Sequence, residues 1–254
     1  MAVTDNLINK EVIRKRALWV SITVIVILIL DQMLKFWIKT NMELGEEFNI
    51  LGLSWARIHF VENEGMAFGW KLFGGKIGKI ALGVFRLVAI VFLFFVLRWL
   101  VKSANKFGLI FCFALIFAGA IGNIIDTTIY GLIFSASTYH GGVAELFPEG
   151  GGYNTFLMGN VVDMFYFPMY KTTWPEWVPY FGGKRFEFFG PVFNVADAAI
   201  STGVISILVF HREIFKEDTK KSIQGVKETS TEEKKDHSPS NVNSEDSDSV
   251  EQSN

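Results

Sequence analysis

The stretch FNVADAAISTGVISILVF, residues 193–210, places one acid, Asp197, at the start of an otherwise apolar run. The length and apolarity of the run predict a helix that enters a membrane. An ionisable side chain at the edge of a bilayer is costly and is by default a candidate for function. A second acid, Asp163, follows two valines in VVDM, residues 161–164. The two aspartates are therefore the first candidates for a functional site.

Three further apolar runs extend the prediction to four membrane spans. Hydrophobic residues make up 50% of the 254, and the mean hydropathy is +0.31. A spanning helix needs about 20 mainly apolar residues. The runs that qualify cover residues 17–38, 77–101, 107–129 and 192–211. The expected fold is an all-α membrane protein with four transmembrane helices.

Basic residues predict the orientation of these spans. They gather before the first span, around the turn between the second and third, and after the fourth: Lys10, Arg14, Lys15, Arg16; Arg98, Lys102, Lys106; His211, Arg212, Lys216, Lys220, Lys221. Four crossings put all three groups on one side, and the positive-inside rule makes that side the cytoplasm. Both termini are then cytoplasmic, and the loops 39–76 and 130–191 face outward.

The ends of the chain differ from its body. Residues 1–16 are expected to be a cytoplasmic N-terminus, and 17–213 the membrane body. A cleaved signal peptide is the alternative for the N-terminus, but no small-residue cleavage site follows the first apolar run. Residues 214–254 are mostly Ser, Glu, Asp, Lys and Asn, which predicts a disordered cytoplasmic tail or, alternatively, a docking segment for a partner.

The two outer loops carry different patterns. Residues 48–60 mix Ile, Leu, Trp and Phe with polar residues, which predicts short strands and a small outward-facing β-like platform on the membrane. The loop 130–191 is rich in glycine. A flexible flap over a site and an ordinary surface excursion are both consistent with that glycine content.

Three of the four predicted spans carry a spaced pair of polar residues near the outer end. The pairs are Asp31 with Lys35, Asn123 with Asp126, and Asn194 with Asp197. Residues three or four apart lie on the same face of a helix. The pairs also lie at about the same depth in the bilayer. One site near the outer face could therefore collect all of them.

Each polar residue also has a purely structural interpretation. Asp31 with Lys35 is consistent with an interfacial ion pair, and Asn123 and Asn194 with hydrogen bonds that hold helices together. A carboxylate such as Asp197 can cap the start of a helix, and Asp163 could be an exposed loop acid. Their occurrence together favours a site.

Five short motifs, taken in order, resemble the bacterial lipoprotein signal peptidase family, signal peptidase II. They are DQMLK at 31–35, NEGMAF at 63–68, GAIGNIID at 119–126, VD at 162–163 and FNVAD at 193–197. The resemblance covers the chain from about residue 18 to residue 210. A single motif of this length would be weak, whereas five in the family's order are specific.

The resemblance implies an aspartic endopeptidase of the bacterial inner membrane, with its active site near the outer face. Such an enzyme cleaves prolipoproteins just before the cysteine that carries diacylglycerol. Asp163 and Asp197 would then be the catalytic pair. The residues that shape or support the site would be Asp31, Lys35, Asn63, Gly65, Gly119, Asn123, Asp126, Asn194 and Ala196. The implied partners are lipid-modified prolipoproteins, membrane phospholipids and globomycin-type inhibitors, with no nucleic acid.

The chemistry of paired aspartates is consistent with that implication. Two adjacent carboxylates share one proton, so that one acts on a water molecule as a base and the other polarises the scissile carbonyl as an acid. No metal or other cofactor is expected. The four histidines have no His-Glu-x-x-His spacing, and no Gly-x-Ser-x-Gly elbow is present.

Two other classes of protein stay open as alternatives. A small proton-coupled transporter could use intramembrane carboxylates as a relay, although the polar residues gather at one interface and no related pair of broken helices is evident. A non-catalytic membrane scaffold would leave the paired aspartates unexplained.

The chain departs from the family pattern in several places. Thr127 stands where many family members have an arginine. Either Arg57, Lys184 or Arg185 supplies that charge from elsewhere, or nothing replaces it. Met66 stands where the family often has alanine. The segments 130–160 and 170–191 are longer than usual. These departures concern substrate preference and inhibitor contacts more than the type of reaction.

Overall fold

A computed structural model describes residues 9–64, 75–103 and 106–211 of the chain. The chain divides into two units, residues 1–209 and 210–254, and the fold described here is that of the first. The predicted tail and Gly65 lie outside the described residues, so their expectations stay untested.

Four helices make up about half of the described residues. They are α1 Lys10–Asn41, α2 Gly75–Lys102, α3 Phe107–Ile125 and α5 Val195–Phe210. The first three are long and apolar enough to cross a membrane, which confirms three of the predicted spans by length and composition. Helix α5 is apolar but only 16 residues long. The fourth span therefore stays a prediction.

The outer surfaces of these helices are apolar. Met33 on α1 and Phe92 on α2 are each 66% exposed, and Ile205 on α5 is 59% exposed. Side chains of this kind on several helices would form a large apolar surface in water, whereas lipid tails solvate them. The helices are therefore suited to a bilayer.

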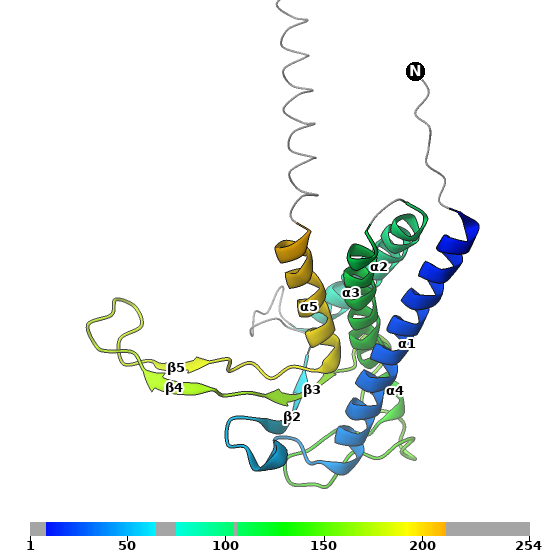
Figure 1. The fold of residues 1–254 in the computed structure, drawn as a ribbon. Helices are drawn as coiled ribbons and strands as arrows, with labels where there is room; N and C mark the ends of the chain where they lie inside the picture. The colour runs from blue at the N-terminus through cyan, green and yellow to red at the C-terminus, as the bar shows by residue number, and fades with distance from the viewer. Residues whose placement is uncertain (1–8, 65–74, 104–105, 212–254) are drawn as a thin grey trace, which may run out of the picture. The chain divides into compact units, whose positions relative to one another are not determined.

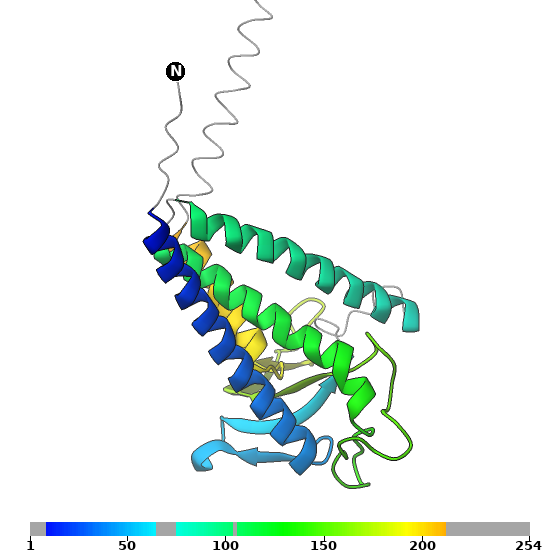
Figure 2. The same cartoon turned by 90° about the vertical axis from the view of Figure 1, so that its right-hand side faces the viewer.

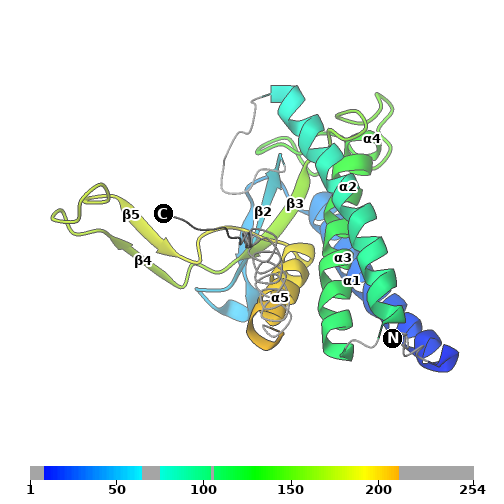
Figure 3. The same cartoon turned by 90° about the horizontal axis from the view of Figure 1, so that it is seen from above.

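Small residues let α3 and α5 approach closely. A Cβ atom on Gly119 of α3 would lie 2.3 Å from the backbone oxygen of Ala196 on α5. One on Gly203 of α5 would lie 2.7 Å from the backbone oxygen of Cys112 on α3. Close backbone contact through small residues is typical of helix packing in membranes. Figure 1 and Figure 3 both show α1, α3 and α5 side by side.

Helix α2 contacts a different part of the chain near its start. Figure 2 shows α2 and α3 close together near their connection and separated toward Gly75. There α2 contacts the segment 130–191. The Lys79 ammonium group donates to Asn160 Oδ1 at 2.5 Å, and Leu157 packs against Gly83. The N-terminal half of α2 therefore contacts residues that precede a strand of the sheet.

A three-stranded antiparallel sheet lies at one end of the helices. Its strands are β1 Glu47–Asn49, β2 Arg57–Asn63 and β3 Val161–Tyr166, in the order β1-β2-β3, and the 3-10 turn η1 Ile50–Gly52 follows β1. The first two strands confirm the prediction for residues 48–60. The third strand comes from the segment 130–191 and is buried over its first four residues. The interpretation of Asp163 as an exposed loop acid is therefore wrong.

A hydrophobic core joins this sheet to the helices. It comprises Ile38 and Met42 of α1, Phe60 of β2, Val162 and Met164 of β3, and Tyr130 and Phe134 after α3. The chain leaves α3 through one π-helical turn, η3 Asp126–Tyr130, and a short helix, α4 Gly131–Ile133. A π turn is wider than an α turn and is frequent at functional sites. Asp126, Thr127 and Tyr130 are all buried in it.

A second, two-stranded sheet extends from the body. Strands β4 Tyr170–Thr173 and β5 Arg185–Phe188 form an antiparallel hairpin that reaches away from α1, α2 and α3 (Figures 1 and 3). Trp174 packs on Phe181 and Phe186 at the end of the hairpin where the loop connects the two strands. Glycine content alone predicts a loose excursion here, whereas cross-strand pairs give the segment regular structure.

Candidate functional site

Strand β3 places Asp163 beside the start of α5. In the sheet Asp163 stands opposite Val61 of β2. Beyond it, the Phe165 amide donates to the carbonyl oxygen of Phe193 at 2.7 Å, and the Phe193 amide donates back at 3.0 Å. This pairing aligns β3 with the residues just before α5. Two motifs that are 30 residues apart in the sequence therefore meet in space.

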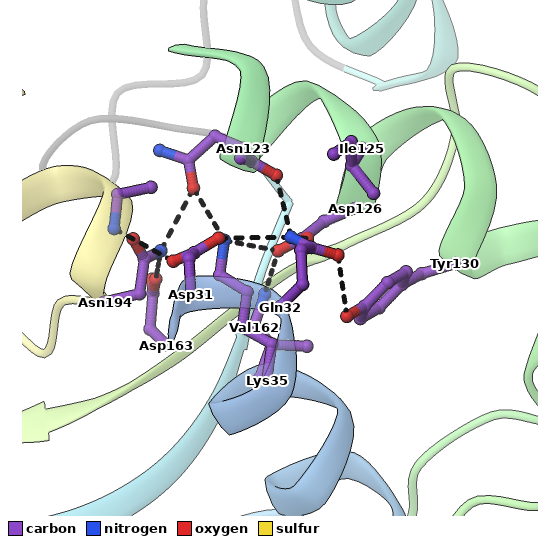
Figure 4. A network of polar contacts seen from close by, with 12 residues as sticks. Asp31, Gln32, Lys35, Asn123, Ile125, Asp126, Tyr130, Val162, Asp163 and Asn194 are labelled. Carbon is purple, nitrogen blue, oxygen red and sulfur yellow. Dashed lines mark hydrogen bonds and ion pairs between the residues drawn. The ribbon is translucent and has the colours of Figure 1, made fainter. Parts of the chain in front are cut away.

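Asn194 connects the two candidate acids. Its amide group donates to Asp163 Oδ1 at 2.6 Å, and its side-chain oxygen accepts from the backbone N–H of Asp197 at 2.9 Å. The Asp197 carboxylate accepts in turn from the Asn194 backbone N–H at 3.4 Å. This reciprocal pair is a capping box, with Asn194 as the N-cap of α5. Figure 4 shows Asn194 between Asp163 and Asn123.

Asn123 of α3 makes the second connection. Its amide group donates to Asp197 Oδ1 at 2.8 Å, and its side-chain oxygen accepts from Asn194 at 3.1 Å. Asp197 therefore does more than cap a helix, because one of its oxygens is held by another element. The side-chain amide of Asn63 on β2 also donates to Asp163 Oδ2, at 3.3 Å. The amides predicted to support the site all contact a candidate acid.

Lys35 lies in a buried ion cluster next to the acids. Its ammonium group is 2.9 Å from Asp31 Oδ2, 2.9 Å from Asp126 Oδ2 and 3.0 Å from Asn123 Oδ1. All three charged side chains are fully buried. This confirms the predicted pairing of Asp31 with Lys35. The pair belongs to a buried cluster of three charges, however, and is not an ion pair at the membrane interface. Removing one partner from such a cluster leaves an uncompensated buried charge, which costs about 3–5 kcal/mol.

The two carboxylates of this cluster also hold the backbone near the site. Asp31 Oδ1 accepts from the Ala196 amide at 2.9 Å, and Asp126 Oδ2 accepts from the Val162 amide at 3.2 Å. Each bond fixes a residue adjacent to a candidate acid. Gly119 and Ala196 contribute small size at the α3–α5 contact.

Gln32 belongs to the site but was not predicted from the sequence. Its amide donates to Asp31 Oδ2 at 3.1 Å and to Asp126 Oδ1 at 3.0 Å, and its oxygen accepts from the Tyr130 hydroxyl at 3.2 Å. Nothing in its spacing distinguishes it from an ordinary polar residue at the end of a span. Its adjacency to Asp31 is the only signal in the sequence.

The two candidate acids have different surroundings. Asp163 is 3% exposed, whereas Asp197 is half-buried. Burial, followed by the nearby charge of Asp197, raises the pKa of Asp163 from its ordinary 3.8 to about 7, against the opposing effect of hydrogen bonds from Asn194 and Asn63. A buried carboxyl group that still binds a proton near neutral pH is suited to act as a general acid.

Arg86 of α2 is the second residue that the sequence analysis missed. Its Nη1 donates to Thr127 Oγ1 at 3.2 Å. The suggestion that Arg57 supplies this charge is wrong, because Arg57 pairs with Glu47 at 2.9 Å and donates to Ser54. Lys184 and Arg185 lie in the exposed hairpin. The signal was available, since Arg86 is the only charged residue between Lys79 and Arg98.

A metal site is not evident in the described ranges. Within residues 9–64, 75–103 and 106–211, no three His, Cys, Asp or Glu side chains form a group that could hold a metal ion. The acids of the site are instead engaged by amides, by backbone N–H groups and by Lys35.

Comparison with known proteins agrees with these motifs. The sequence profile described as signal peptidase (SPase) II matches residues 23–212. A lipoprotein signal peptidase of Porphyromonas gingivalis is 49% identical over 75% of this chain and 81% of its own length. One of Amoebophilus asiaticus is 32% identical over 76% and 77%. A solved bacterial membrane enzyme has 22% identity and a TM-score of 0.49, covering 80% of this chain and 90% of that one. The chain belongs to the signal peptidase II family.

Proposed function

We propose that this protein is an aspartic endopeptidase that removes signal peptides from lipoproteins, cleaving before the lipid-bearing cysteine. Its relatives are named lipoprotein signal peptidases, which supports the substrate class. One observation supports the aspartic catalytic type most strongly. The Asn194 side chain is hydrogen-bonded both to the Asp163 carboxylate and to the backbone N–H of Asp197. The side chain of Asn194 thus keeps the buried Asp163 and the more exposed Asp197 in a fixed relation.

The proposed reaction uses a water molecule between the two acids. Ionised Asp197 takes a proton from the water, and the oxygen attacks the scissile carbonyl carbon. Protonated Asp163 donates a hydrogen bond to the carbonyl oxygen as negative charge develops there. The C–N bond then breaks, and the proton held by Asp197 passes to the leaving nitrogen. The oxygen and one hydrogen of the water end in the new carboxyl group, and the other hydrogen ends in the new amine.

The surrounding amides suit this chemistry because they do not titrate. Asn123, Asn194 and Asn63 donate hydrogen bonds to the two acids without changing charge during the reaction. The Lys35 cluster fixes the backbone at Ala196 and Val162 through its two carboxylates. Pre-organised donors of this kind lower the cost of orienting the acids in each turnover.

The proposed setting is the outer face of the bacterial inner membrane. The acids lie where α5 begins and where the sheet meets the helices, at the end of α3 away from the predicted cytoplasmic turn. A lipid-modified prolipoprotein can place its acyl chains among membrane phospholipids while its backbone reaches that level. Globomycin-type inhibitors are expected to compete for the same place.

A gel-shift assay on a diacylglyceryl-modified prolipoprotein tests this proposal. Asp163→Asn and Asp197→Asn keep the shape of the side chain and remove its titratable proton. Each should abolish cleavage while the protein still inserts into the membrane. Glu47→Gln is the matched control, since this exposed acid on β1 lies outside the network and should leave cleavage unchanged. Near-normal turnover by either aspartate variant would refute the assignment.

A further inference from the structure

The β4–β5 hairpin has an aromatic side and a charged side. Residues that pair across two strands point to the same side of a sheet, and successive residues along one strand alternate between its sides. The register of the hairpin therefore divides its residues into two sets. The aromatic side carries Tyr170, Thr172, Phe186 and Phe188, and the charged side carries Lys171, Thr173, Arg185 and Glu187. The hairpin is thus amphipathic.

The aromatic side lies open in the part of the chain that the structure describes. Tyr170 and Phe188, which stand opposite each other, are both more than half exposed. In the loop that joins the strands, Trp177 is 81% exposed and Tyr180 is 91% exposed. Tyr180 also has a φ of +65°, in the left-handed region that a bulky residue adopts only at a cost. Exposed apolar surface of this kind marks an interaction site.

Aromatic contacts connect the hairpin to the start of α5. The ring of Phe189 lies 6.5 Å from that of Phe188 and, edge-on, 5.9 Å from that of Phe193, two residues before α5. Helix α5 then exposes Val204 and Ile205, which suit contact with lipid tails. Figure 1 shows the hairpin leaving the body level with the start of α5 and running across the direction of that helix, and Figure 3 shows how far it extends. A segment in this position runs along the surface of a bilayer that α5 enters.

The residue types of the hairpin match the boundary between lipid tails and headgroups. Tryptophan and tyrosine are enriched there, because their rings are apolar with one polar edge. Lys184 and Arg185 are exposed at the loop end of β5, and the Lys184 ammonium group lies 5.8 Å from the centre of the Phe181 ring. Long basic side chains beside aromatic rings reach the phosphate groups of lipids. The hairpin therefore fits a phospholipid surface in both shape and charge.

We propose that the β4–β5 hairpin is a membrane anchor: its aromatic side lies among the phospholipids of the leaflet that adjoins the start of α5, and its charged side faces water. The inference goes beyond the proposed function, because it assigns a role to a surface that the proposed reaction does not use. Such an anchor attaches the body to the bilayer at a second place, away from α1, α2 and α3. It also fixes the depth at which α5 begins.

Two neighbouring threonines of β4 provide matched probes. Thr172 lies on the aromatic side and Thr173 on the charged side, and both are exposed. In a Cys112→Ala background, which removes the only cysteine of the chain, Thr172→Cys and Thr173→Cys each accept a nitroxide label. The labelled full chain is placed in vesicles of phosphatidylethanolamine and phosphatidylglycerol. Oxygen concentrates among lipid tails, whereas a nickel chelate stays in water. The ratio of oxygen to nickel accessibility should be several-fold higher for the label at Thr172.

The rings of the loop provide the second arm. Trp177→Ser combined with Tyr180→Ser removes two exposed rings, so the ratio at Thr172 should fall toward that at Thr173. Glu176→Gln, at an exposed acid of the same loop, is the control and should leave the ratio unchanged.

Two results would overturn the inference. One is an equal, water-like ratio at Thr172 and Thr173. The other is a label at Thr172 that is shielded from both reagents, which would indicate that another protein covers the aromatic side. The accessibilities are measured without cleavage, so the inference and the proposed function fail independently.

Discussion

At the scale of single residues, Asn194 combines two tasks that usually fall to different side chains. Its carbonyl oxygen caps α5, and its amide group orients Asp163. An asparagine suits both because it donates and accepts at once without carrying charge. The geometry of the acid pair is thereby coupled to the start of a helix. Any displacement of α5 would therefore move Asp197 relative to Asp163.

The buried state of Asp163 has a consequence for stability. Its pKa is about 7 in the folded protein, against an ordinary 3.8. Because the folded pKa is raised, the folded state holds this proton more tightly than the unfolded chain does. The stability associated with that proton is fully present below about pH 4 and is lost as the pH rises through about 7. Above that, an ionised and buried carboxylate destabilises the fold.

Asp163→Asn is therefore expected to be more stable than the wild type at pH 8, by about 1–3 kcal/mol, because it removes a buried charge. The advantage should shrink toward pH 5, where the wild-type acid is protonated. Thermal unfolding in detergent at the two pH values measures this. Glu47→Gln, at an exposed acid, serves as the control. A difference that is equal at both pH values would show that Asp163 is not the buried proton carrier.

Sequence spacing predicted the residues that act within one helix and missed those that act between helices. Asp31 with Lys35 follows from a separation of four, and Asn194 with Asp197 from a separation of three. Arg86 has no polar neighbour at helical spacing, since its partner is on another helix. The general rule that a lone intramembrane charge indicates function would have identified it.

At the scale of elements, the contact between α3 and α5 sets the site. Asn123 and Asp197 meet because the two backbones come close at Gly119 and Ala196. A side chain at position 119 would push α5 away from α3. The acid on α5 would then lose its amide donor on α3.

Gly119→Ala should accordingly destabilise the protein by about 1–3 kcal/mol and slow cleavage, because its Cβ would lie 2.3 Å from the Ala196 oxygen. Helix propensity alone predicts the opposite sign, since alanine is favoured over glycine by about 1 kcal/mol. Gly150→Ala is the control, because nothing lies within 4 Å of its Cβ position. Thermal unfolding and the gel-shift assay report both effects. A stabilised Gly119→Ala protein would contradict the close packing.

Hydropathy predicted α1, α2 and α3 well, because the bilayer requires long apolar helices whatever the tertiary contacts. It could not predict that β3 pairs with β2. The pairing of Val61 with Asp163 joins residues about a hundred positions apart, and strand pairing over such distances depends on the complete fold. The β4–β5 hairpin was missed for a similar reason. Its pattern of aromatics fits an interfacial loop equally well.

At the scale of the whole molecule, function depends on how the chain crosses the membrane. The pairing of Phe165 with Phe193 puts Asp163 and the start of α5 at the same level. If the N-terminus is cytoplasmic, as the basic residues predict, three spans before β3 would put that level at the outer face. The fourth crossing would return the chain to the cytoplasm.

Reporter fusions test this topology. Fusions after Lys106 and after Lys216 should read as cytoplasmic, and fusions near Gly75 and Gly152 as external, because basic residues flank the first two positions. Alkaline phosphatase and a cytoplasmic reporter at each position give opposite signals and control for expression. An external C-terminus would mean that α5 does not cross.

In the proposed mechanism, one proton shared by Asp163 and Asp197 drives the hydrolysis. Its most direct test is the pH dependence of kcat/KM for a lipid-modified prolipoprotein. The raised pKa of Asp163 predicts a bell-shaped profile whose alkaline limb lies near 7, since loss of that proton removes the acid. Asp163→Asn and Asp197→Asn should have no measurable profile. A rate that keeps rising to about pH 9, as expected for a thiolate or hydroxide nucleophile, would contradict the account.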